Sequence, residues 1–415
     1  MKKLSLIFIL ILNACGGGVQ VDPHSELNLS LNQVETYNLP GDFPPDLLIP
    51  AFDPSTVFTL DFTSAAVLPI KLDSSPLDLQ KLWPIWDGAA LGLGLSPNDL
   101  FMLSPSQAFL LGVEDLVYYN PTNGEVWQSV KINEPILLEQ ALAYSRAEDC
   151  DGDGLVESSI GPGTFSPNTP NQVVATPTQV FVSVSNLCFS PDFNSVYTQA
   201  MLLVFDLQTE APYLSPSDPA FIVLEGFNAT GLTLTETSLI ATATGDTIFQ
   251  DGQNLPETSS YLNEVSLSTQ QVTRSLDLGM IVANFKGVAL NEDQSLAWLG
   301  SANFSQIYEI DLASFSLSQS FSLSEVANDF ISDQVFDKNR NLLFASSFNQ
   351  SGIFVLNPQE PKQVDFLDLN NLDQPGLTGV GSLALRPGLA GVDFEGPDLW
   401  ALTGNPGRLL GLQTY

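Results

Sequence analysis

The chain has 415 residues and is strongly acidic, with 13 Lys and Arg against 47 Asp and Glu and a formal charge of −34. This scarcity of basic residues argues against nucleic-acid binding, because no basic stripe is available to replace phosphate counterions. The 44% hydrophobic content, with 26 Phe, is ample for a packed core and argues against a disordered chain.

The first fifteen residues have the pattern of a secretion signal. Met1 to Lys3 is a basic start, and Leu4 to Leu12 is an apolar run interrupted only by Ser5. That run is too short to span about 30 Å of hydrocarbon, which needs about 20 residues. It ends in Leu12-Asn13-Ala14-Cys15, followed by three glycines, and this sequence resembles the lipobox of a bacterial lipoprotein.

The resemblance implies that residues 1–14 are a lipoprotein signal peptide and that Cys15 carries the lipid, palmitate included, as the mature N-terminus. Acyl chains of this kind hold a protein stably on a membrane. Gly16, where an inner-membrane lipoprotein has Asp, implies an outer-membrane lipoprotein of the cell envelope, with the membrane face left open. Residues 15–28, which include the single histidine His24, are typical of a flexible tether. The alternatives are an ordinary secretory signal with a chance Cys and an uncleaved anchor.

Two cysteines remain once Cys15 is assigned to lipid. In an oxidising envelope Cys150 and Cys188 allow only one pairing, and we predict a disulfide between them. The alternative is a pair of buried free thiols.

Beyond the tether, short apolar runs alternate with clusters of Asn, Asp, Gly, Pro and Ser, which is typical of strands and turns. One unit recurs, consisting of a strand, a short polar turn that opens on Asp or Asn, and a second strand. The turns open at Asp61, Asn120, Asp206, Ser266, Asp311, Asn357 and Gly411. Their shortest spacings, 45 and 46 residues, match the repeat of roughly 40–50 residues found in β-propeller blades.

A second unit lies upstream of these turns and is clearest from Gly287 to Asn303. It resembles the repeat of the YVTN family of β-propellers, with Asn291-Glu292-Asp293-Gln294 in place of that family's Pro-Asp-Gly turn. The repeats predict an all-β fold, a seven-bladed β-propeller over residues 29–415. We expect the N-terminal segment Gln33–Leu39 to complete the last blade, which stops after its third strand. A pair of β-sandwiches with irregular loops is the alternative.

The longest spacing, between Asn120 and Asp206, indicates an insertion at about 139–172 that is rich in Cys and Asp. Its D-x-D-x-D-G sequence resembles the first half of an EF-hand loop, with carboxylates at alternate positions and a glycine for the tight turn. Ile160 stands where an EF-hand has its bidentate Glu. We predict a Ca²⁺ site whose ligands are Asp149, Asp151, Asp153, the backbone carbonyl of Leu155, and Glu157. The alternative is a solvated Asp-Gly turn.

The sequence lacks a phosphate-binding loop, a nucleophile elbow and a histidine cluster, so we expect a binding protein more than an enzyme. The main hypothesis is a lipid-anchored envelope propeller that binds or scaffolds a protein or another envelope ligand. Its acidic surface suits a cationic or cation-bridged ligand. The alternative is a propeller hydrolase or lactonase with a carboxylate-bound metal in the central channel.

Overall fold

The computed structural model describes residues 19–20, 31–38, 47–50, 52–61, 66–71, 86–87, 97–189, 195–208, 212–250, 253–324, 329–359, 364–369, 378–386, 398–405 and 407–414. The predicted signal peptide 1–14, Cys15 and His24 lie outside these residues. In the part of the chain that the structure describes, no helix is long and apolar enough to cross a membrane.

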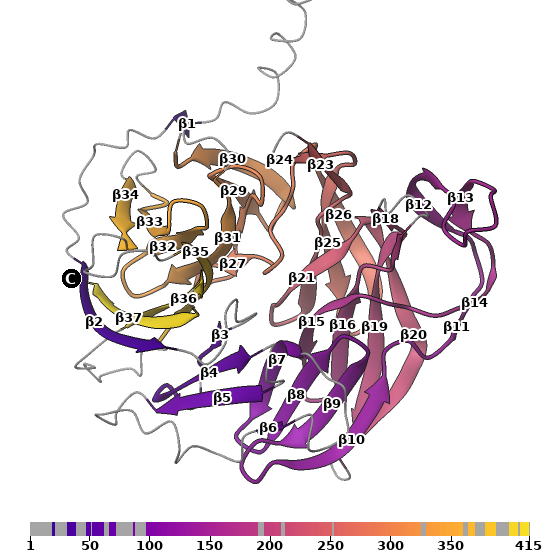
Figure 1. Cartoon of the computed structure of the whole chain (residues 1–415), viewed down its shortest axis with the longest axis horizontal. Helices are drawn as coiled ribbons and strands as arrows, with labels where there is room; N and C mark the ends of the chain where they lie inside the picture. The colour runs from indigo at the N-terminus through magenta and orange to yellow at the C-terminus, as the bar shows by residue number, and fades with distance from the viewer. Residues whose placement is uncertain are drawn as a thin grey trace, which may run out of the picture.

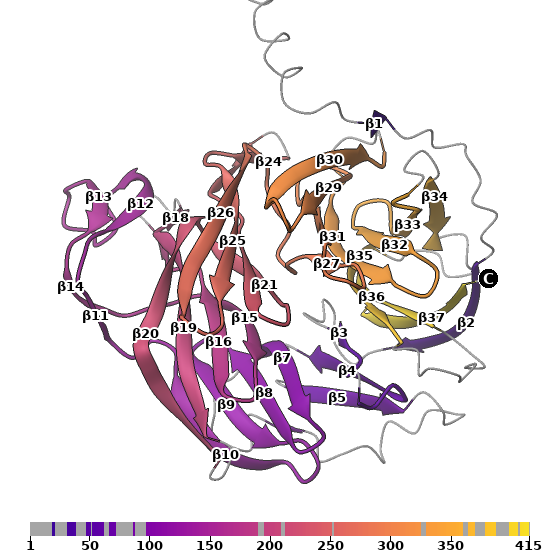
Figure 2. The ribbon, with the colours of Figure 1, turned by 180° about the vertical axis from the view of Figure 1, so that it is seen from behind.

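The described strands form antiparallel sheets that succeed one another around a common centre, which makes the protein an all-β propeller (Figures 1 and 2). Six of the sheets are complete blades, each with at least three strands of five residues or more. From the inner to the outer strand, blade 1 consists of β7 (Pro97–Ser104), β8 (Gln107–Gly112), β9 (Asp115–Asn120) and β10 (Glu125–Lys131), and blade 2 of β15 (Pro170–Ala175), β16 (Gln179–Val184), β19 (Gln199–Gln208) and β20 (Tyr213–Phe227). In the same order, blade 3 consists of β21 (Ala229–Leu234), β22 (Ser238–Ala243), β25 (Ser260–Ser266) and β26 (Gln271–Gly279), and blade 4 of β27 (Ala289–Leu290), β28 (Leu296–Gly300), β29 (Gln306–Asp311) and β30 (Ser316–Ser322). Blade 5 consists of β31 (Ile331–Asp337), β32 (Leu342–Ser347), β33 (Gly352–Leu356) and β34 (Val364–Asp368), and blade 6 of β35 (Thr378–Leu385), β36 (Leu399–Asn405), β37 (Arg408–Thr414) and β2 (Leu31–Asn38).

The prediction of seven blades is therefore wrong, since six are complete. The first repeat gives only a reduced sheet, in which the hairpin of β4 (Thr56–Asp61) and β5 (Ala66–Lys71) is flanked by the two-residue strands β3 (Leu47–Leu48) and β6 (Trp86–Asp87). Prolines and glycines around β3 and β6 explain the shortening, because proline cannot donate to a ladder and glycine weakens a strand. They are Pro44, Pro45, Pro50, Pro84, Gly88, Gly92 and Gly94.

The N-terminal strand completes blade 6, as the sequence led us to expect. Strand β2 pairs antiparallel with β37, with Leu31 opposite Thr414 and Asn38 opposite Arg408. The pairing places the two ends of the propeller in one sheet, side by side in both views (Figures 1 and 2). Within the predicted tether, β1 (Val19–Gln20) pairs in parallel with the outer edge of β30.

The reduced sheet occupies the gap between blades 1 and 6 and closes the ring. One side of it packs Phe58 and Leu60 against blade 1, where Leu110 is fully buried. Its other side packs Val57 and Ile70 against Trp400 of blade 6. The core is thus a series of apolar layers, one between each sheet and the next.

Polar side chains on the inner strands join neighbouring blades. Asp99 of blade 1 is buried and accepts a 2.7 Å hydrogen bond from the backbone N–H of Val173 in blade 2. Asp333 of blade 5 does the same for the N–H of Leu383 in blade 6 at 2.8 Å. These carboxylates satisfy backbone donors that would otherwise be buried without a partner.

Blades 3 and 4 approach so closely that their contact requires glycine. A Cβ added to Gly231 would lie 2.0 Å from the backbone nitrogen of Gly287. Gly287 itself has φ +82°, a left-handed conformation that glycine adopts without strain.

We predict that Gly231→Ala lowers the free energy of unfolding by about 1–3 kcal/mol or more, because the backbone of the next blade must move away. Urea denaturation at neutral pH measures the change. Gly161→Ala is the control, since a Cβ there meets nothing within 4 Å, and it should stay within about 0.5 kcal/mol of the parent. Equal stabilities for the two variants would contradict the predicted close contact.

Candidate functional site

The connection from blade 1 to blade 2 carries the insertion, which folds as an arm of two successive hairpin segments (Figure 1). Strand β11 (Ile136–Leu138) pairs with β14 (Gly163–Phe165), and further along the arm β12 (Leu142–Glu148) pairs with β13 (Glu157–Ile160). The acidic loop, residues 149–157, closes the outer segment.

The acidic loop brings together four of the five predicted ligands. Oxygen atoms of the Asp149, Asp151, Asp153 and Glu157 carboxylates all lie within 4.8 Å of one another. No other such group of metal-binding side chains is present among the described residues. Leu155, the fifth predicted ligand, has an exposed side chain and donates its backbone N–H to Asp153 at 2.7 Å.

Backbone N–H groups of the loop fix the carboxylates in place. Asp149 accepts from the N–H groups of Gly152 at 2.7 Å and Gly154 at 3.0 Å, and both glycines have positive φ. Glu157 accepts from the N–H of Cys150 at 3.0 Å, which ties the end of the loop to its beginning. The sequence D-x-D-x-D-G therefore encodes a turn in which alternate side chains point inward.

Carboxylate oxygens are the ligands that hard cations such as Ca²⁺ and Mg²⁺ prefer, and Asp151 and Asp153 are exposed to solvent. Four carboxylates this close repel one another when no cation is bound.

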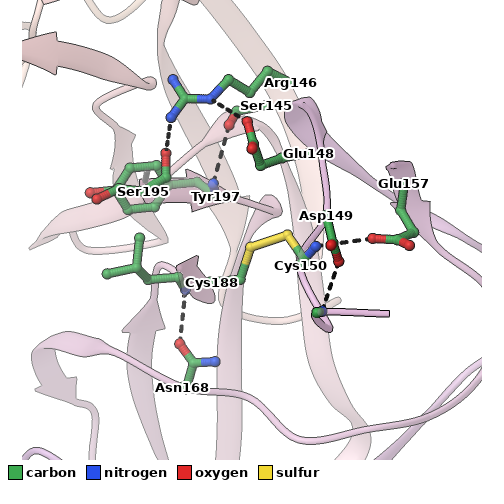
Figure 3. The surroundings of a disulfide bond; sticks show 12 residues. Ser145, Arg146, Glu148, Asp149, Cys150, Glu157, Asn168, Cys188, Ser195 and Tyr197 are labelled. Carbon is green, nitrogen blue, oxygen red and sulfur yellow. Dashed lines mark hydrogen bonds and ion pairs between the residues drawn. A yellow bond between two sulfur atoms is a disulfide. The ribbon is translucent and has the colours of Figure 1, made fainter. Parts of the chain in front are cut away.

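A disulfide joins the acidic loop to blade 2 (Figure 3). Cys150 and Cys188 are the expected pair, with Sγ atoms 2.07 Å apart and Cα atoms 5.8 Å apart. Cys188 is not part of β16, because β16 ends at Val184 and Asn186 adopts a left-handed φ of 51°. Cys188 lies instead on β17 (Leu187–Phe189), which pairs with β18 (Ser195–Tyr197).

An ion-pair network that sequence analysis missed also fastens the arm. Arg146 on β12 donates to the carboxylate of Glu257 and, at 2.6 Å, to the backbone carbonyl of Ser195. It also lies 3.6 Å from the fully buried Asp246. Asp246 precedes the hairpin of β23 (Thr247–Gln250) and β24 (Gln253–Pro256), so the network links the arm to blade 3.

The surroundings of Asp246 shift the pKa of its carboxyl. Burial raises the pKa of its carboxyl above the ordinary 3.8, while the 2.6 Å hydrogen bond from Ser145 and the charge of Arg146 act in the opposite direction. The carboxyl thus holds its proton to a higher pH in the folded protein than in the unfolded chain.

The arm lies on one particular face of the ring. In antiparallel blades, connections between successive blades and connections between second and third strands emerge on the same face. We call this the insertion face, and the hairpins β12–β13, β17–β18 and β23–β24 lie at this end of blades 2 and 3 (Figures 1 and 2). Of the eleven exposed large apolar side chains among the described residues, eight belong to such connections. They are Val113, Leu137, Leu155, Val156, Phe189, Met280, Phe285 and Phe304.

The other three do not share that face. Phe52 follows β3, Tyr213 begins β20, and Leu317 lies near the start of β30. Phe52 and Tyr213 therefore belong to connections on the opposite face. The exposed apolar surface of the propeller is thus concentrated where the insertion stands.

The comparison with solved structures supports the fold. The structure is similar to the crystal structure of the Cps50 (Swd1) β-propeller domain from Myceliophteria thermophila, with a TM-score of 0.57. The match covers 92% of this chain and 99% of that one at 13% sequence identity, so it establishes a shared fold alone. No protein-family model matches the sequence, and no curated protein matches it. The fold class is therefore the β-propeller.

We predict that Asp246→Asn removes a pH-dependent loss of stability. Between pH 3.8 and the raised pKa the folded protein binds more protons at Asp246 than the unfolded chain, so this group's contribution to stability falls as the pH rises. The wild type should therefore lose stability relative to the Asn variant between pH 4 and neutrality, as measured by denaturant unfolding at several pH values.

Asp311→Asn is the control for this prediction. Hydrogen bonds from Ser314 lower the pKa of the Asp311 carboxyl, so its contribution to stability is lost only as the pH falls below 3.8. A wild type whose stability relative to Asp246→Asn stays constant or increases with rising pH would contradict the proposed burial of charge.

Proposed function

We propose that this protein is a lipid-anchored β-propeller of the cell envelope that binds a protein partner on its insertion face, with Ca²⁺ held in the acidic loop. The concentration of exposed apolar side chains on one face carries the proposal. Soluble monomers rarely gather such surface without an interaction to bury it. A propeller fold, shared with the Cps50 (Swd1) domain, is consistent with a binding or scaffolding role.

Charge defines the kind of partner. The formal charge of −34 repels acidic proteins and attracts basic ones. A groove of about 1040 Å³ runs between the arm and the outer strands of blades 2 and 3, where Ile136, Phe221 and Val272 form part of an apolar lining. Glu134 and Asp218 are exposed at this groove. A partner segment with apolar residues flanked by basic residues suits both the apolar lining of the groove and the negative charge of the protein.

The lipid anchor remains a proposal from the sequence around Cys15. We expect Cys15→Ser to move the protein from the membrane fraction to the soluble fraction of lysed cells, since the acyl chains supply the membrane affinity. Gly17→Ala leaves the cleavage pattern intact and is the control. Retention of the Cys15→Ser variant in the membrane pellet would contradict the proposed lipid anchor.

We expect calcium to order the acidic loop, because a bound cation removes the repulsion among its carboxylates. Chelation with EDTA should speed protease cleavage between residues 145 and 165, as followed by mass spectrometry. Asp149→Asn combined with Asp153→Asn should abolish the EDTA effect, whereas Asp293→Asn, in a distant turn, should retain it. Cleavage rates that do not change with EDTA would contradict the calcium site.

Partner binding is tested by photo-crosslinking in intact cells, followed by identification of the trapped protein. Phe285→Ser with Phe304→Ser should reduce the trapped amount at least tenfold, because buried aromatic side chains dominate interface energies. Phe52→Ser with Tyr213→Ser, on the opposite face, is the matched control. Loss of the trapped protein only in the control pair would place the interface on the other face and overturn the proposal.

A further inference from the structure

The outer strand of blade 2, β20, turns part of its backbone away from its own sheet at the groove beside the arm. Leu207 on β19 donates its backbone N–H toward β16, to the residue that precedes that strand. Backbone groups alternate in direction along a strand, so Leu203 and Met201 also face β16. The residues opposite them on β20 are Phe221 and Val223. The N–H and C=O groups of these two residues therefore point away from β19, and both residues line the groove.

Side chains of the neighbouring blades close the outer edge of β20 on either side of this tract. Gln128 of blade 1 accepts from the N–H of Leu214 at 2.6 Å and donates to its C=O at 3.0 Å. Asn263 of blade 3 accepts from the N–H of Glu225 at 3.1 Å and donates to its C=O at 3.0 Å. Between these caps lie residues 221–223, the open edge, whose outward groups form no hydrogen bond with any described residue.

A free backbone edge of this kind accepts another strand, because its N–H and C=O groups are already arranged for a ladder. The chain itself fills the equivalent position of blade 4. There β1 adds a fifth strand to the outer edge of β30, with Val19 opposite Phe321 and Gln20 opposite Ser322. Blade 2 offers the same outer position, and the arm runs beside β20 in both views (Figures 1 and 2).

The groove provides an apolar contact for each face of a strand added there. Alternate side chains of β20 pack in two layers, with Val223 in the layer toward blade 1 and Ile222 in the layer toward blade 3. Beyond β20, Ile136 of the arm extends the first layer and Val272 of blade 3 extends the second. A segment with apolar side chains on both of its faces therefore fits the groove.

The rim of the groove is acidic. Glu134, Glu139 and Asp218 are exposed among the residues that line it. Lys131 is the only basic residue among the described ones in this lining, and it pairs with Asp115 at 2.7 Å. A second copy of this chain, with its formal charge of −34, is repelled from this rim, whereas a segment flanked by Lys or Arg is attracted.

We propose that the open edge binds an extended segment of a basic partner protein by strand addition, so that the segment becomes a fifth strand of blade 2. The outward N–H and C=O groups of Phe221 and Val223 pair with the backbone of the segment. Apolar side chains of the segment contact Ile136 and Val272, and its flanking basic residues lie at the acidic rim. This inference rests on the proposed function, since the segment belongs to the same basic partner.

The probe is the fluorescently labelled peptide Lys-Thr-Val-Ile-Val-Thr-Lys, titrated with the full-length protein and followed by fluorescence anisotropy. We expect saturable binding, and the same peptide with Glu in place of both Lys should bind about tenfold more weakly, because the rim repels it.

Val223→Pro should weaken the binding of the basic peptide about tenfold or more, because proline lacks the N–H and its ring obstructs a neighbouring strand. Val223→Ala is the matched control, since it shortens the side chain but keeps the N–H, and it should bind within about threefold of the wild type. Equal losses in the two variants would assign the binding to the side chain and overturn strand addition. Absence of saturable binding by the wild type would overturn it as well.

Strand β20 already holds a proline, Pro216, at an outward-facing position opposite Phe205, so its ladder tolerates this substitution. If Val223→Pro nevertheless does not fold, N-methylation of the peptide takes its place. Methyl groups on alternate residues block one edge of the added strand. One of the two alternate series should therefore lose binding while the other keeps it, and equal affinities of the two series would contradict the proposal.

The same samples separate this inference from the proposed function. Phe285→Ser with Phe304→Ser should bind the peptide like the wild type. Peptide binding with the expected pattern of variants supports strand addition even if no partner is trapped in cells, whereas trapping without peptide binding overturns strand addition alone. A dimer of this protein that Val223→Pro dissociates, in place of peptide binding, would assign the edge to a second copy and overturn the proposal.

Discussion

Each described blade of this propeller has two apolar faces, and the strands of one blade can bury neither of them. Strand β9 shows this directly, since successive side chains of a strand point to opposite faces. Leu116 and Tyr118 pack against blade 2, while Val117 and Tyr119 pack toward the reduced sheet. Only a closed ring gives each face a neighbour, so closure is the condition on which the rest of the structure depends.

This condition explains why a sheet as small as β3–β6 is retained. Two long strands suffice to present one face to blade 1 and the other to blade 6, and Trp400 of blade 6 is fully buried at that contact. The pairing of β2 with β37 closes the same region through backbone hydrogen bonds. Ring closure therefore relies on two neighbouring contacts. One is the apolar packing of the reduced sheet between blades 1 and 6, and the other is the pairing of β2 with β37.

The insertion is long, and its buried Leu138 and Leu142 pack in the apolar cluster of blades 1 and 2. Three further kinds of interaction hold it: the Cys150–Cys188 disulfide, the Arg146 network with Asp246 and Glu257, and the hydrogen bonds within the acidic loop. They converge on the hairpins of blades 2 and 3, so the arm is fixed at its outer end. A surface fixed in this way loses less entropy when it binds a ligand, which suits a binding role.

Sequence patterns predicted the structural features that depend only on residues close together in the chain. Turn landmarks such as Asn120, Ser266 and Asp311 end the third strands of their blades, because an Asx or Ser side chain favours a turn wherever it stands. Asp61 and Gly411 failed as landmarks, since Asp61 ends the second strand of the reduced sheet and Gly411 lies within β37. Both stand in sheets whose strand lengths depend on prolines or on pairing with a strand that is distant in the sequence.

Sequence spacing also predicted that the acidic side chains of the loop lie together, because they all fall within nine residues. It could not reveal Arg146 beside Asp246, because that contact joins the arm to blade 3, far along the chain. Such contacts depend on the packing of neighbouring blades, which no local pattern encodes.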